Sequence, residues 1–377
     1  MAKNNELSGK REPLVRIVRR TDAGRIQSWG IRIAAVLVAL VICAVLIYAL
    51  VKMNPLEVYK AMFFGAFGTT RKLWITLRDT AMLLCIGIGL APAFRMKFWN
   101  IGAEGQILVG GVATAVCMIY LKGLPEILLF ACMLFLSSLA GAVWGLIPAW
   151  FKAHFGTNET LFTLMMNYVA ISITSFCVSK WENPYGSNSV GIINPGTKEG
   201  WLPDLFGQQY LINVLMVAAL VVLMYIYMER TKHGYELAVV GDSENTARYA
   251  GIDVKKVIIR TMLLSGALCG FSGFLAVSGA SHTISTGTAG GRGFTAIIVA
   301  WLAKFNTFTM ALIALLLVFL DKGAVEIASK FNLNDYASQI ITGILLFFIL
   351  GSEFFINYRL VFAHKEKHTV QTAGKEA

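Results

Sequence analysis

Uncharged stretches long enough to cross a bilayer constrain the fold of this chain more than any other feature. The run Ile31–Val51 carries a single charge, Arg32, near its start. A helix of about 20 apolar residues spans the ~30 Å hydrocarbon core of a membrane. Leu211–Met228 and Ile340–Leu350, with their flanks, repeat the pattern. Only 15% of residues are charged, too few for the polar outer faces of a soluble helical fold. The sequence therefore predicts an all-α integral membrane protein.

The apolar runs predict about ten transmembrane helices. Segment 293–304 is short for a crossing, so we expect it to be broken or re-entrant, or to extend back into residues 283–292. If the N-terminus is inside, the inside segments hold about twice as many Lys and Arg residues as the outside segments. This bias places both termini in the cytoplasm. The predicted spans are 31–51, 73–94, 104–121, 126–148, 160–179, 210–229, 261–280, 293–304, 306–321 and 337–357.

The same pattern divides the chain into three parts. Residues 1–30 form a basic cytoplasmic segment, residues 31–357 the transmembrane domain, and residues 358–377 a cytoplasmic tail. The first apolar run is read as a retained span, because it is longer than the ~7–15-residue core of a signal peptide and follows a long polar stretch. Inside the domain, the polar segment 230–260 is too hydrophilic to cross a membrane and forms a cytoplasmic loop.

Several chemistries find no support in the sequence. It has no GxxxxGK[ST] phosphate-binding loop and no HExxH or GxSxG motif, so neither ATP binding through a P-loop nor a catalytic residue is predicted. The six cysteines lie singly inside apolar runs, without CxxC, and the five histidines have no ligand spacing. No cofactor, metal site or disulfide framework is therefore expected. The net charge of +11 comes from basic residues at the ends of apolar runs, which indicates topology and not nucleic-acid binding.

A polar cluster opens the span at 104–121. Asn100, Glu104 and Gln106 stand among glycines in the stretch Ala91–Gly111. An ionisable group in hydrocarbon costs about 2.5–3.5 kcal/mol on insertion scales, so Glu104 should face protein, water or a transported solute. The competing interpretation is the start of an interfacial helix with Glu104 near the headgroups.

Two further polar positions lie deep in the predicted spans. Asn167 sits about two turns inside a helix that Thr157 or Asn158 can cap, and an amide at that depth needs a partner. A hydrogen bond to another helix is the simplest account of it, and a ligand is the alternative. The pair Arg78–Asp79 is expected to be a structural or interfacial ion pair.

Two connecting segments have distinct patterns. In the cytoplasmic loop, Asp242 or Ser243 can cap a short helix at 244–250 that Gly251 ends. Such a helix fits either of two roles: a surface on which a motor domain pushes, or a plain connector between two spans. The cluster Gly290, Gly291 and Gly293 resembles an anion-binding nest, but flexibility of the loop before a short helix is the favoured account of it.

Taken together, these stretches resemble the permease family that serves branched-chain amino acid, ribose-type sugar and nucleoside ABC importers. Residues 98–106, FWNIGAEGQ, are similar to the (L)FNIGAEGQ element of its nucleoside-type members. Residues 163–170 and 234–252 follow the same group's pattern, and the resemblance covers about residues 75–355. The GGIDLSVG-like phrase of ribose-type relatives is absent. Trp99 stands where Phe is usual, and the 78–79 pair is more charged than usual.

This resemblance implies a transport subunit of a bacterial plasma membrane that is not itself an enzyme. Two permeases would form the pore, either this chain with a shorter relative or two copies of it. The N-terminal head and first span resemble the longer member of such a pair. Two cytoplasmic ATPases would dock on the 230–260 loops, and an extracellular binding lipoprotein would deliver nucleoside. Membrane lipid would surround the assembly, and no nucleic acid takes part. The candidate coupling residues are Glu244, Asn245, Arg248 and Gly251.

A division into spans 1–5 and 6–10 would give two halves of inverted topology. The span entered through Asn100–Gln106 then corresponds to the one entered through Gly290–Gly293, and paired glycine-interrupted segments point to a translocation site. The candidate pathway residues are Asn100, Glu104, Gln106, Asn167 and Thr295. The alternatives are a ribose or other simple-sugar permease and, less favoured, a secondary transporter driven by an ion gradient, which would need more intramembrane carboxylates than Glu104.

Overall fold

The computed structural model describes residues 54–332 without a break, residues 15–19 and 358–362, and scattered positions within 30–52 and 340–351. The chain divides into two compact units. One comprises Val58–Ser338 and holds the helices discussed below. The other comprises Met1–Glu57 together with Gln339–Ala377. The predicted spans 31–51 and 337–357 lie outside the continuously described residues.

The terminal unit contains a short β-ladder. Strand β1 (Val15–Arg19) pairs antiparallel with β2 (Tyr358–Phe362), in a register that sets Val15 opposite Phe362. The sequence analysis placed these residues in a basic head and a tail and predicted no strand there. The all-α expectation therefore holds for the helical unit and misses this ladder, because two five-residue segments so distant in sequence carry no local signal of pairing.

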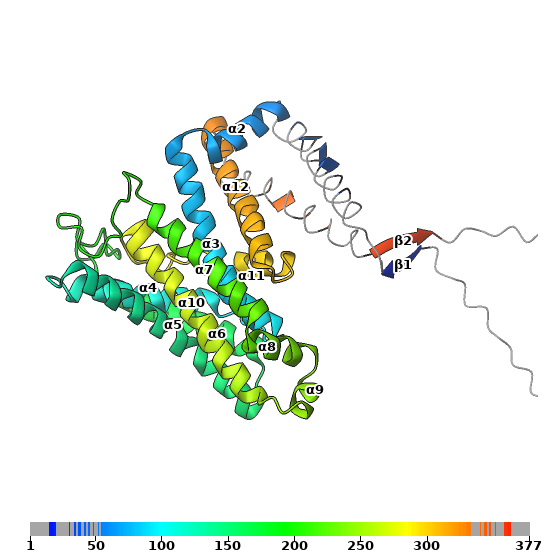
Figure 1. The fold of residues 1–377 in the computed structure, drawn as a ribbon. Helices are drawn as coiled ribbons and strands as arrows, with labels where there is room; N and C mark the ends of the chain where they lie inside the picture. The colour runs from blue at the N-terminus through cyan, green and yellow to red at the C-terminus, as the bar shows by residue number, and fades with distance from the viewer. Residues whose placement is uncertain are drawn as a thin grey trace, which may run out of the picture. The chain divides into compact units, whose positions relative to one another are not determined.

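Seven helices in the described part of the chain are long and apolar enough to cross a membrane (Figure 1). Each matches a predicted span, so the multi-pass membrane protein is confirmed, while a total of ten spans and an inverted repeat remain predictions. The helices are α3 (Thr70–Arg95), α4 (Ala103–Tyr120), α5 (Glu126–Phe155), α6 (Glu159–Trp181), α7 (Leu211–Arg230), α10 (Val254–Ala276), continued by the π-helical turn η1 (Val277–Ser281), and α12 (Thr307–Phe331).

Helix α11 (Arg292–Leu302) is too short to cross a membrane. Its 11 residues span about 16 Å, roughly half of the hydrocarbon core. It runs beside α3 in the same direction: Arg292 faces Asp79, Val299 faces Gly87, and Trp301 packs on Phe94. The helix does not extend back into residues 283–291, so α11 begins part-way along α3.

Helix α12 is longer than predicted. The predicted span ended at residue 321, where charged residues begin, yet the helix continues to Phe331. The extra turns find partners on neighbouring helices: Lys322 pairs with Asp79, and Glu326 pairs with Lys72 at 2.8 Å. Helix α2 (Pro55–Phe67) packs there as well, because Gly323 lies against the side chain of Met62. Tertiary ion pairs therefore extend the helix beyond its apolar run.

Helix α10 forms the centre of the bundle. Its most apolar window is 83% buried, against 28% for that of α5. Glycines allow the backbones of α4, α5 and α10 to touch: a Cβ atom on Gly110 would overlap Gly270, and one on Gly141 would overlap Gly266. Small residues at such crossings let helices approach closely where packing replaces the hydrophobic effect.

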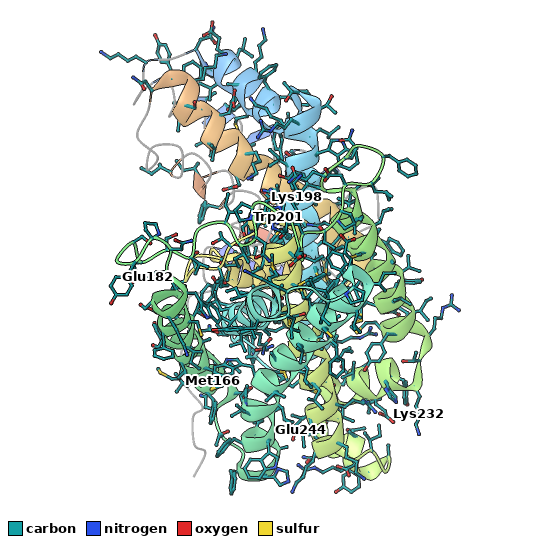
Figure 2. The ribbon with its side chains drawn as sticks, turned by 90° about the vertical axis from the view of Figure 1, so that its left-hand side faces the viewer. Met166, Glu182, Lys198, Trp201, Lys232 and Glu244 are labelled. Carbon is teal, nitrogen blue, oxygen red and sulfur yellow. The ribbon has the colours of Figure 1, made fainter. Side chains whose placement is uncertain are left out.

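Polar segments gather at the two ends of this bundle. Figure 2 shows Lys198 and Trp201, in the long loop 182–210, well separated from Lys232 and Glu244. At the Glu244 end, Arg95 of α3 pairs with Glu229 of α7 at 2.8 Å. Helices α3 and α7 therefore end at the same end of the bundle, as the span prediction requires for these two helices.

Candidate functional site

Glu104 joins the start of α4 to the start of α11. Its two carboxylate oxygens accept the backbone N–H groups of Gly291, at 2.7 Å, and Gly293, at 2.9 Å. The first backbone N–H groups of a helix have no partner within it and carry its positive dipole end, so a carboxylate is well suited to them. Gly291 adopts φ +74°, which favours glycine, and a Cβ on Gly293 would lie 2.7 Å from Glu104 Oε2. The glycine cluster is thus a nest, and its anion is an internal one.

Asn100 and Gln106 form a buried amide pair beneath this junction. Asn100 is 0% and Gln106 1% exposed. Asn100 donates to Gln106 Oε1 at 3.4 Å and to the Ser265 hydroxyl of α10 at 3.2 Å. The side-chain oxygen Oδ1 of Asn100 accepts the N–H of Gly102 at 3.0 Å. The pair fixes the turn before α4 against the central helix.

Asn167 fastens α6 to the same turn. Its Nδ2 donates to the carbonyl of Ile101 at 2.9 Å, and its Oδ1 accepts the N–H of Gly105 at 2.8 Å. Both polar atoms of the Asn167 amide therefore form hydrogen bonds to the neighbouring segment. Of the two roles expected from the sequence, an interhelical hydrogen bond and a ligand contact, the structure shows the first. Asn158, not Thr157, caps α6 by accepting the N–H of Leu161. Asn100, Glu104, Gln106 and Asn167 are thus all gathered at one junction.

Thr295 lies one turn into α11 and lines a pocket of about 190 Å³. Its hydroxyl donates to the carbonyl of Gly291 at 3.3 Å. Asp79, Arg292 and Asp321 also line this pocket. Thr295 is therefore separate from the amide pair but joined to Glu104 through the first turn of α11.

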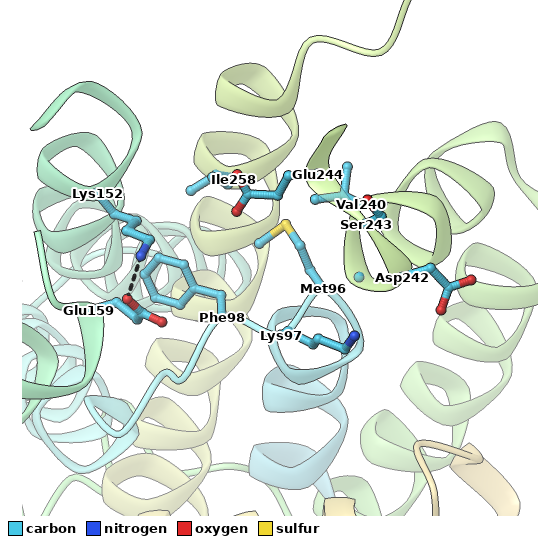
Figure 3. A pocket seen from close by; sticks show the side chains of 11 residues that line it. Met96, Lys97, Phe98, Lys152, Glu159, Val240, Asp242, Ser243, Glu244 and Ile258 are labelled. Carbon is cyan, nitrogen blue, oxygen red and sulfur yellow. Dashed lines mark ion pairs between the residues drawn. The ribbon is translucent and has the colours of Figure 1, made fainter. Parts of the chain in front are cut away.

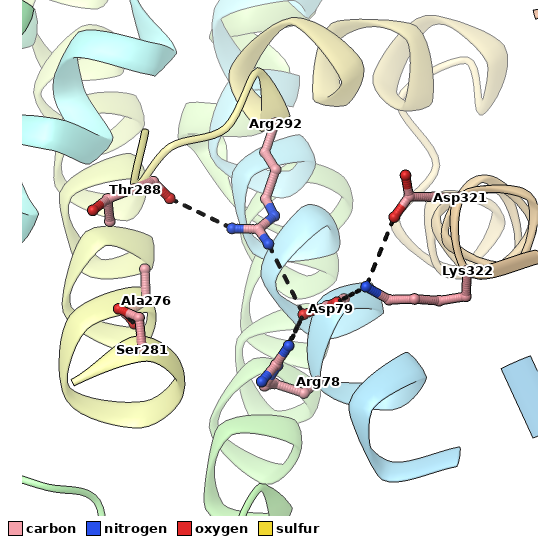
Figure 4. A network of polar contacts seen from close by, with 8 residues as sticks. All are labelled: Arg78, Asp79, Ala276, Ser281, Thr288, Arg292, Asp321 and Lys322. Carbon is pink, nitrogen blue, oxygen red and sulfur yellow. Dashed lines mark hydrogen bonds and ion pairs between the residues drawn. The ribbon is translucent and has the colours of Figure 1, made fainter. Parts of the chain in front are cut away.

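Three cations surround Asp79 (Figure 4). Its carboxylate accepts from Arg78 at 2.8 Å, lies 2.6 Å from the ammonium of Lys322, and 4.0 Å from the guanidinium of Arg292. The Asp79 side chain is only 6% exposed, and Lys322 also lies 3.7 Å from Asp321. This cluster ties α3, α11 and α12 together. From the sequence only Arg78–Asp79 was visible as a pair, since nothing local indicates that residues 292 and 322 would meet it.

The predicted coupling segment folds as two short helices. Helix α8 (Lys232–Asp242) leads to α9 (Glu244–Tyr249), which Ser243 caps by accepting the N–H of Thr246. Gly251 follows with φ +77°. The predicted helix 244–250 with its cap and glycine stop is confirmed to within one residue. Of the two predicted caps, Ser243 is the one used.

Helix α9 presents charged and aromatic side chains to solvent. Glu244 and Arg248 form an i,i+4 pair at 3.6 Å and are 53% and 65% exposed, and Tyr249 is 93% exposed. Asn245 and Gly251 are exposed as well, while Ala247 is buried. The helix is therefore anchored by one small residue and leaves the rest of its surface free.

A pocket of about 190 Å³ lies directly behind α9 (Figure 3). Met96 and Phe98 of the α3–α4 turn line it together with Glu244, and the ion pair Lys152–Glu159, at 2.8 Å, lies beside Phe98. Gly241 of α8 contacts the carbonyl of Arg95, so close that a Cβ there would overlap it. Helix α8 is therefore packed directly against the end of α3, next to the turn that carries Asn100.

At the other end, the loop 182–210 is anchored to η1. Ser278 donates its hydroxyl to the carbonyl of Gly200 at 2.6 Å, and the N–H of Ile193 donates to the carbonyl of His282 at 2.8 Å. The His282 ring stacks on Trp201 with 3.8 Å between centroids. Burial lowers the pKa of His282 below its ordinary value. The loop, predicted to be irregular, is thus fixed at its centre.

The described residues contain no group of three or more His, Cys, Asp or Glu side chains able to hold a metal ion. The five described cysteines form no disulfide with one another; Cys85, Cys117 and Cys269 are buried. The site is accordingly made of amides, hydroxyls, glycines and ion pairs, groups that bind and orient polar solutes.

Known proteins share this sequence over most of its length. The glucose ABC transporter permease TsgB13 of Haloferax volcanii is 28% identical over 344 residues, covering 88% of this chain and 90% of the relative. The guanosine ABC transporter permease NupP of Bacillus subtilis is 30% identical over 297 residues, covering 78% and 85%. The nucleoside ABC transporter permease NupB of Lactococcus lactis is 26% identical over 306 residues, covering 78% and 84%. No solved structure matches the chain.

The family described as branched-chain amino acid transport system, permease component, matches residues 73–350, which contain the helical bundle, the Glu104 junction and the coupling segment. The relatives are transport subunits and not enzymes, in agreement with the absence of catalytic motifs. The chain is therefore a multi-pass membrane permease of the ATP-binding-cassette type and belongs to this branched-chain amino acid transport permease family.

Proposed function

We propose that this permease forms the pathway through which nucleosides enter the cell by alternating access. The observation that carries the proposal is the nucleoside-type phrase at 98–106, which supplies Asn100, Glu104 and Gln106 to the central junction. Two relatives, NupP and NupB, are named as guanosine and nucleoside permeases. A nucleoside is polar but neutral, so its passage needs amides and hydroxyls more than unpaired charge.

The proposed pathway residues are Asn100, Glu104, Gln106, Asn167 and Thr295. In this conformation most of their polar atoms form hydrogen bonds with other protein groups. We assign it to a state in which the pathway is closed to the solute. Because α11 is a half-length helix held at its first turn by Glu104, a shift of α4 relative to α11 would expose these groups to the solute. A packed junction of this kind switches between two discrete arrangements, and such a switch converts small movements into alternating access. In an inverted repeat of spans 1–5 and 6–10, the starts of α4 and α11 would occupy equivalent places.

The proposed coupling residues are Glu244, Asn245, Arg248 and Gly251. Their exposure supports contact with a partner, and the contact of Gly241 with Arg95 offers a route from that partner to the α3–α4 turn. Closure of the motor dimer on ATP binding would press on α9 and shift the equilibrium between inward-open and outward-open states.

Permeases of ABC importers work with ATPase and substrate-binding subunits. We propose two cytoplasmic ATPases, an extracellular binding lipoprotein, and a second permease that is a shorter relative or a copy of this chain. Lys and Arg bias supports cytoplasmic N- and C-termini in a bacterial plasma membrane. This orientation places α9 in the cytoplasm, where ATP is available.

A sugar is the second candidate solute. The glucose permease of Haloferax volcanii covers 88% of this chain, more than either nucleoside relative, and is 28% identical to it. Hydroxyl-rich solutes would use the same amides and hydroxyls.

Uptake of labelled nucleosides, ribose and glucose by source cells with and without the gene separates the candidates. Loss of nucleoside uptake alone, restored by the gene, is the expected result. Loss of sugar uptake with nucleoside uptake intact would retain the permease and reject the nucleoside assignment. Collapse of ion gradients at constant ATP should leave uptake unchanged, whereas a secondary transporter would stop.

Cysteine substitution tests the pathway directly. In a cysteine-depleted background, Thr295→Cys should react with water-soluble thiol reagents because Thr295 lines a pocket. Gln106 is buried in this structure, so Gln106→Cys should react only in the other nucleotide state of the transporter. We expect the same of Glu104→Cys. Uniform inertness of all three in both states would reject the pathway.

A further inference from the structure

Arg292 is the least committed cation in the Asp79 cluster. Among the described residues its guanidinium has two contacts, the carbonyl of Thr288 at 3.5 Å and Asp79 at 4.0 Å, both at the outer limit of such interactions. A guanidinium carries five N–H donors, so most of them are unused. Arg78, by comparison, holds Asp79 at 2.8 Å through two nitrogens and lies over the ring of Tyr210. Arg292 therefore has longer and weaker contacts than Arg78, and most of its donors are available to a solute.

Arg292 lines two pockets. One is the 190 Å³ pocket that Thr295 lines, and the other, of about 250 Å³, lies against η1 and the loop 282–291. The second pocket is lined by the hydroxyl-bearing residues Ser281, Thr283 and Ser285. Complete pockets for drug-sized ligands measure about 300–1,000 Å³, so each of these fits a part of a solute such as the edge of a base.

The charges around Arg292 are formally balanced. The three cations Arg78, Arg292 and Lys322 lie near Asp79 and Asp321, and the carboxylate of Glu104 binds the first turn of α11. A further anion is therefore not required here, and a neutral solute with strong hydrogen-bond acceptors suits the site. Arg292 is also the first residue of α11, where a cation is electrostatically unfavourable. That cost argues for a purpose beyond helix formation.

We propose that Arg292 recognises two adjacent acceptors on the base of a transported nucleoside, and so favours 6-oxopurine nucleosides over 6-aminopurine ones. The planar guanidinium fork matches the O6 and N7 acceptors of guanine or hypoxanthine, whereas adenine presents an amino donor beside N7. This inference rests on the proposed nucleoside transport and names the substrate class of the same pathway. The hydroxyls of the neighbouring pocket would face the ribose.

The test is uptake of labelled inosine and adenosine by gene-deleted cells that carry wild-type or variant permease together with its native partner subunits. Arg292→Lys retains the charge and removes the fork. A bidentate contact to a base typically provides about 5- to 150-fold discrimination, so the ratio of inosine to adenosine uptake should fall at least about fivefold. Arg260→Lys, whose arginine pairs with Glu236 at 2.8 Å, is the matched exchange and should leave the ratio unchanged.

An equal fall in inosine and adenosine uptake in Arg292→Lys, with normal amounts of protein in the membrane, would overturn the inference and assign Arg292 a structural role. Absence of all nucleoside uptake in wild type would instead reject the proposed function. If Arg292→Lys fails to accumulate, Thr295→Cys reports on the same pocket. Inosine should slow its labelling by a water-soluble thiol reagent more than adenosine does, and equal protection by the two would contradict the proposal.

Discussion

The carboxylate of Glu104 lies 2.9 Å from the backbone nitrogen of Gly293, so that a side chain of α4 completes the first turn of α11. This contact explains how a helix of half the membrane thickness can start inside the bundle. Its first N–H groups would otherwise be unsatisfied where no water is available, at a cost of several kcal/mol. The same contact links the two segments that the proposed repeat would set in equivalent positions.

Glu104→Gln should destabilise the permease. The amide presents one acceptor oxygen and one NH₂ group, which cannot accept from the second glycine N–H. Loss of a hydrogen bond to a charged group costs about 1.5–3 kcal/mol, and thermal unfolding in detergent should register a lower melting temperature. Glu126→Gln, at an exposed position in the first turn of α5, is the matched control and should change little. Equal melting temperatures for the two variants would show that the Glu104 contact contributes no stability.

Asp79→Asn should be more damaging. It leaves Arg78, Lys322 and Arg292 facing one another around an uncharged group that is 6% exposed in the native protein. Removing one partner of a buried ion pair costs about 3–5 kcal/mol. We expect low amounts in the membrane and a reduced melting temperature.

A second substitution distinguishes charge imbalance from lost packing at this position. Asp79→Asn combined with Lys322→Met removes one uncompensated cation and should recover part of the lost stability. Asp321→Asn, with a side chain 70% exposed, should cost less than about 0.5 kcal/mol. If the double variant is no more stable than Asp79→Asn alone, the damage does not come from unpaired positive charge.

Local patterns predicted the elements of this protein better than their meeting places. The seven long spans follow from runs of apolar residues, and the α9 cap follows from Ser243 and Gly251, because these signals lie within a few residues of one another. The site residues Asn100, Glu104, Gln106 and Asn167 were recognisable as polar groups too costly to leave unpaired in a membrane. The distant partners of Asn100 and Glu104 were not, since Ser265 and Gly293 lie 165 and 189 residues away from them and only the packed bundle brings them together.

The same limit explains the incorrect end of α12. Its apolar run stops at Asp321, so sequence reasoning ended the span there, but Lys322 and Glu326 find charged partners on α3. Likewise, the glycine cluster at 290–293 was attributed mainly to loop flexibility, whereas the structure shows a nest that binds Glu104. From the sequence, Glu104 could have been recognised as the anion of this nest only by pairing the polar cluster at 100–106 with the glycine cluster at 290–293.

Arg248→Glu should separate ATP hydrolysis from transport without loss of the fold. Arg248 is 65% exposed, and its pair with Glu244 at 3.6 Å is of the kind worth about 0–1 kcal/mol, so the variant should reach the membrane normally. If α9 contacts the ATPases, reversal of this charge should reduce uptake strongly and weaken co-purification of the ATPases. Lys180→Glu, an exposed charge reversal at the far end of α6, should retain the ATPases. Undiminished uptake by Arg248→Glu would reject the coupling role of α9.

His282 should make the outer loop sensitive to acid. The His282 ring is 8% exposed and stacks on Trp201. Burial lowers the pKa of His282 below its ordinary value, with Arg78 and Lys198 acting in the same direction and Asp204 and a backbone hydrogen bond opposing it. In the unfolded chain the imidazole takes up a proton near pH 6.5, whereas the folded protein resists protonation. The folded state therefore loses stability as pH falls below about 6.5 and is unaffected by this group above about 7.5.

His282→Phe keeps an aromatic ring against Trp201 and removes the proton. We expect the melting temperature of the wild type to drop between pH 7.5 and 5.5, and the drop to be smaller in His282→Phe. About 1 kcal/mol corresponds to roughly 2–4 °C for a domain of 150–250 residues, which a thermal scan resolves. His154→Phe, at an exposed position on α5, is the control and should keep the pH dependence of the wild type. The loop is fixed to η1 through Ile193 and Gly200, so its hydrogen exchange should rise over the same pH interval. Identical pH profiles for wild type and His282→Phe would mean that another group controls the acid response.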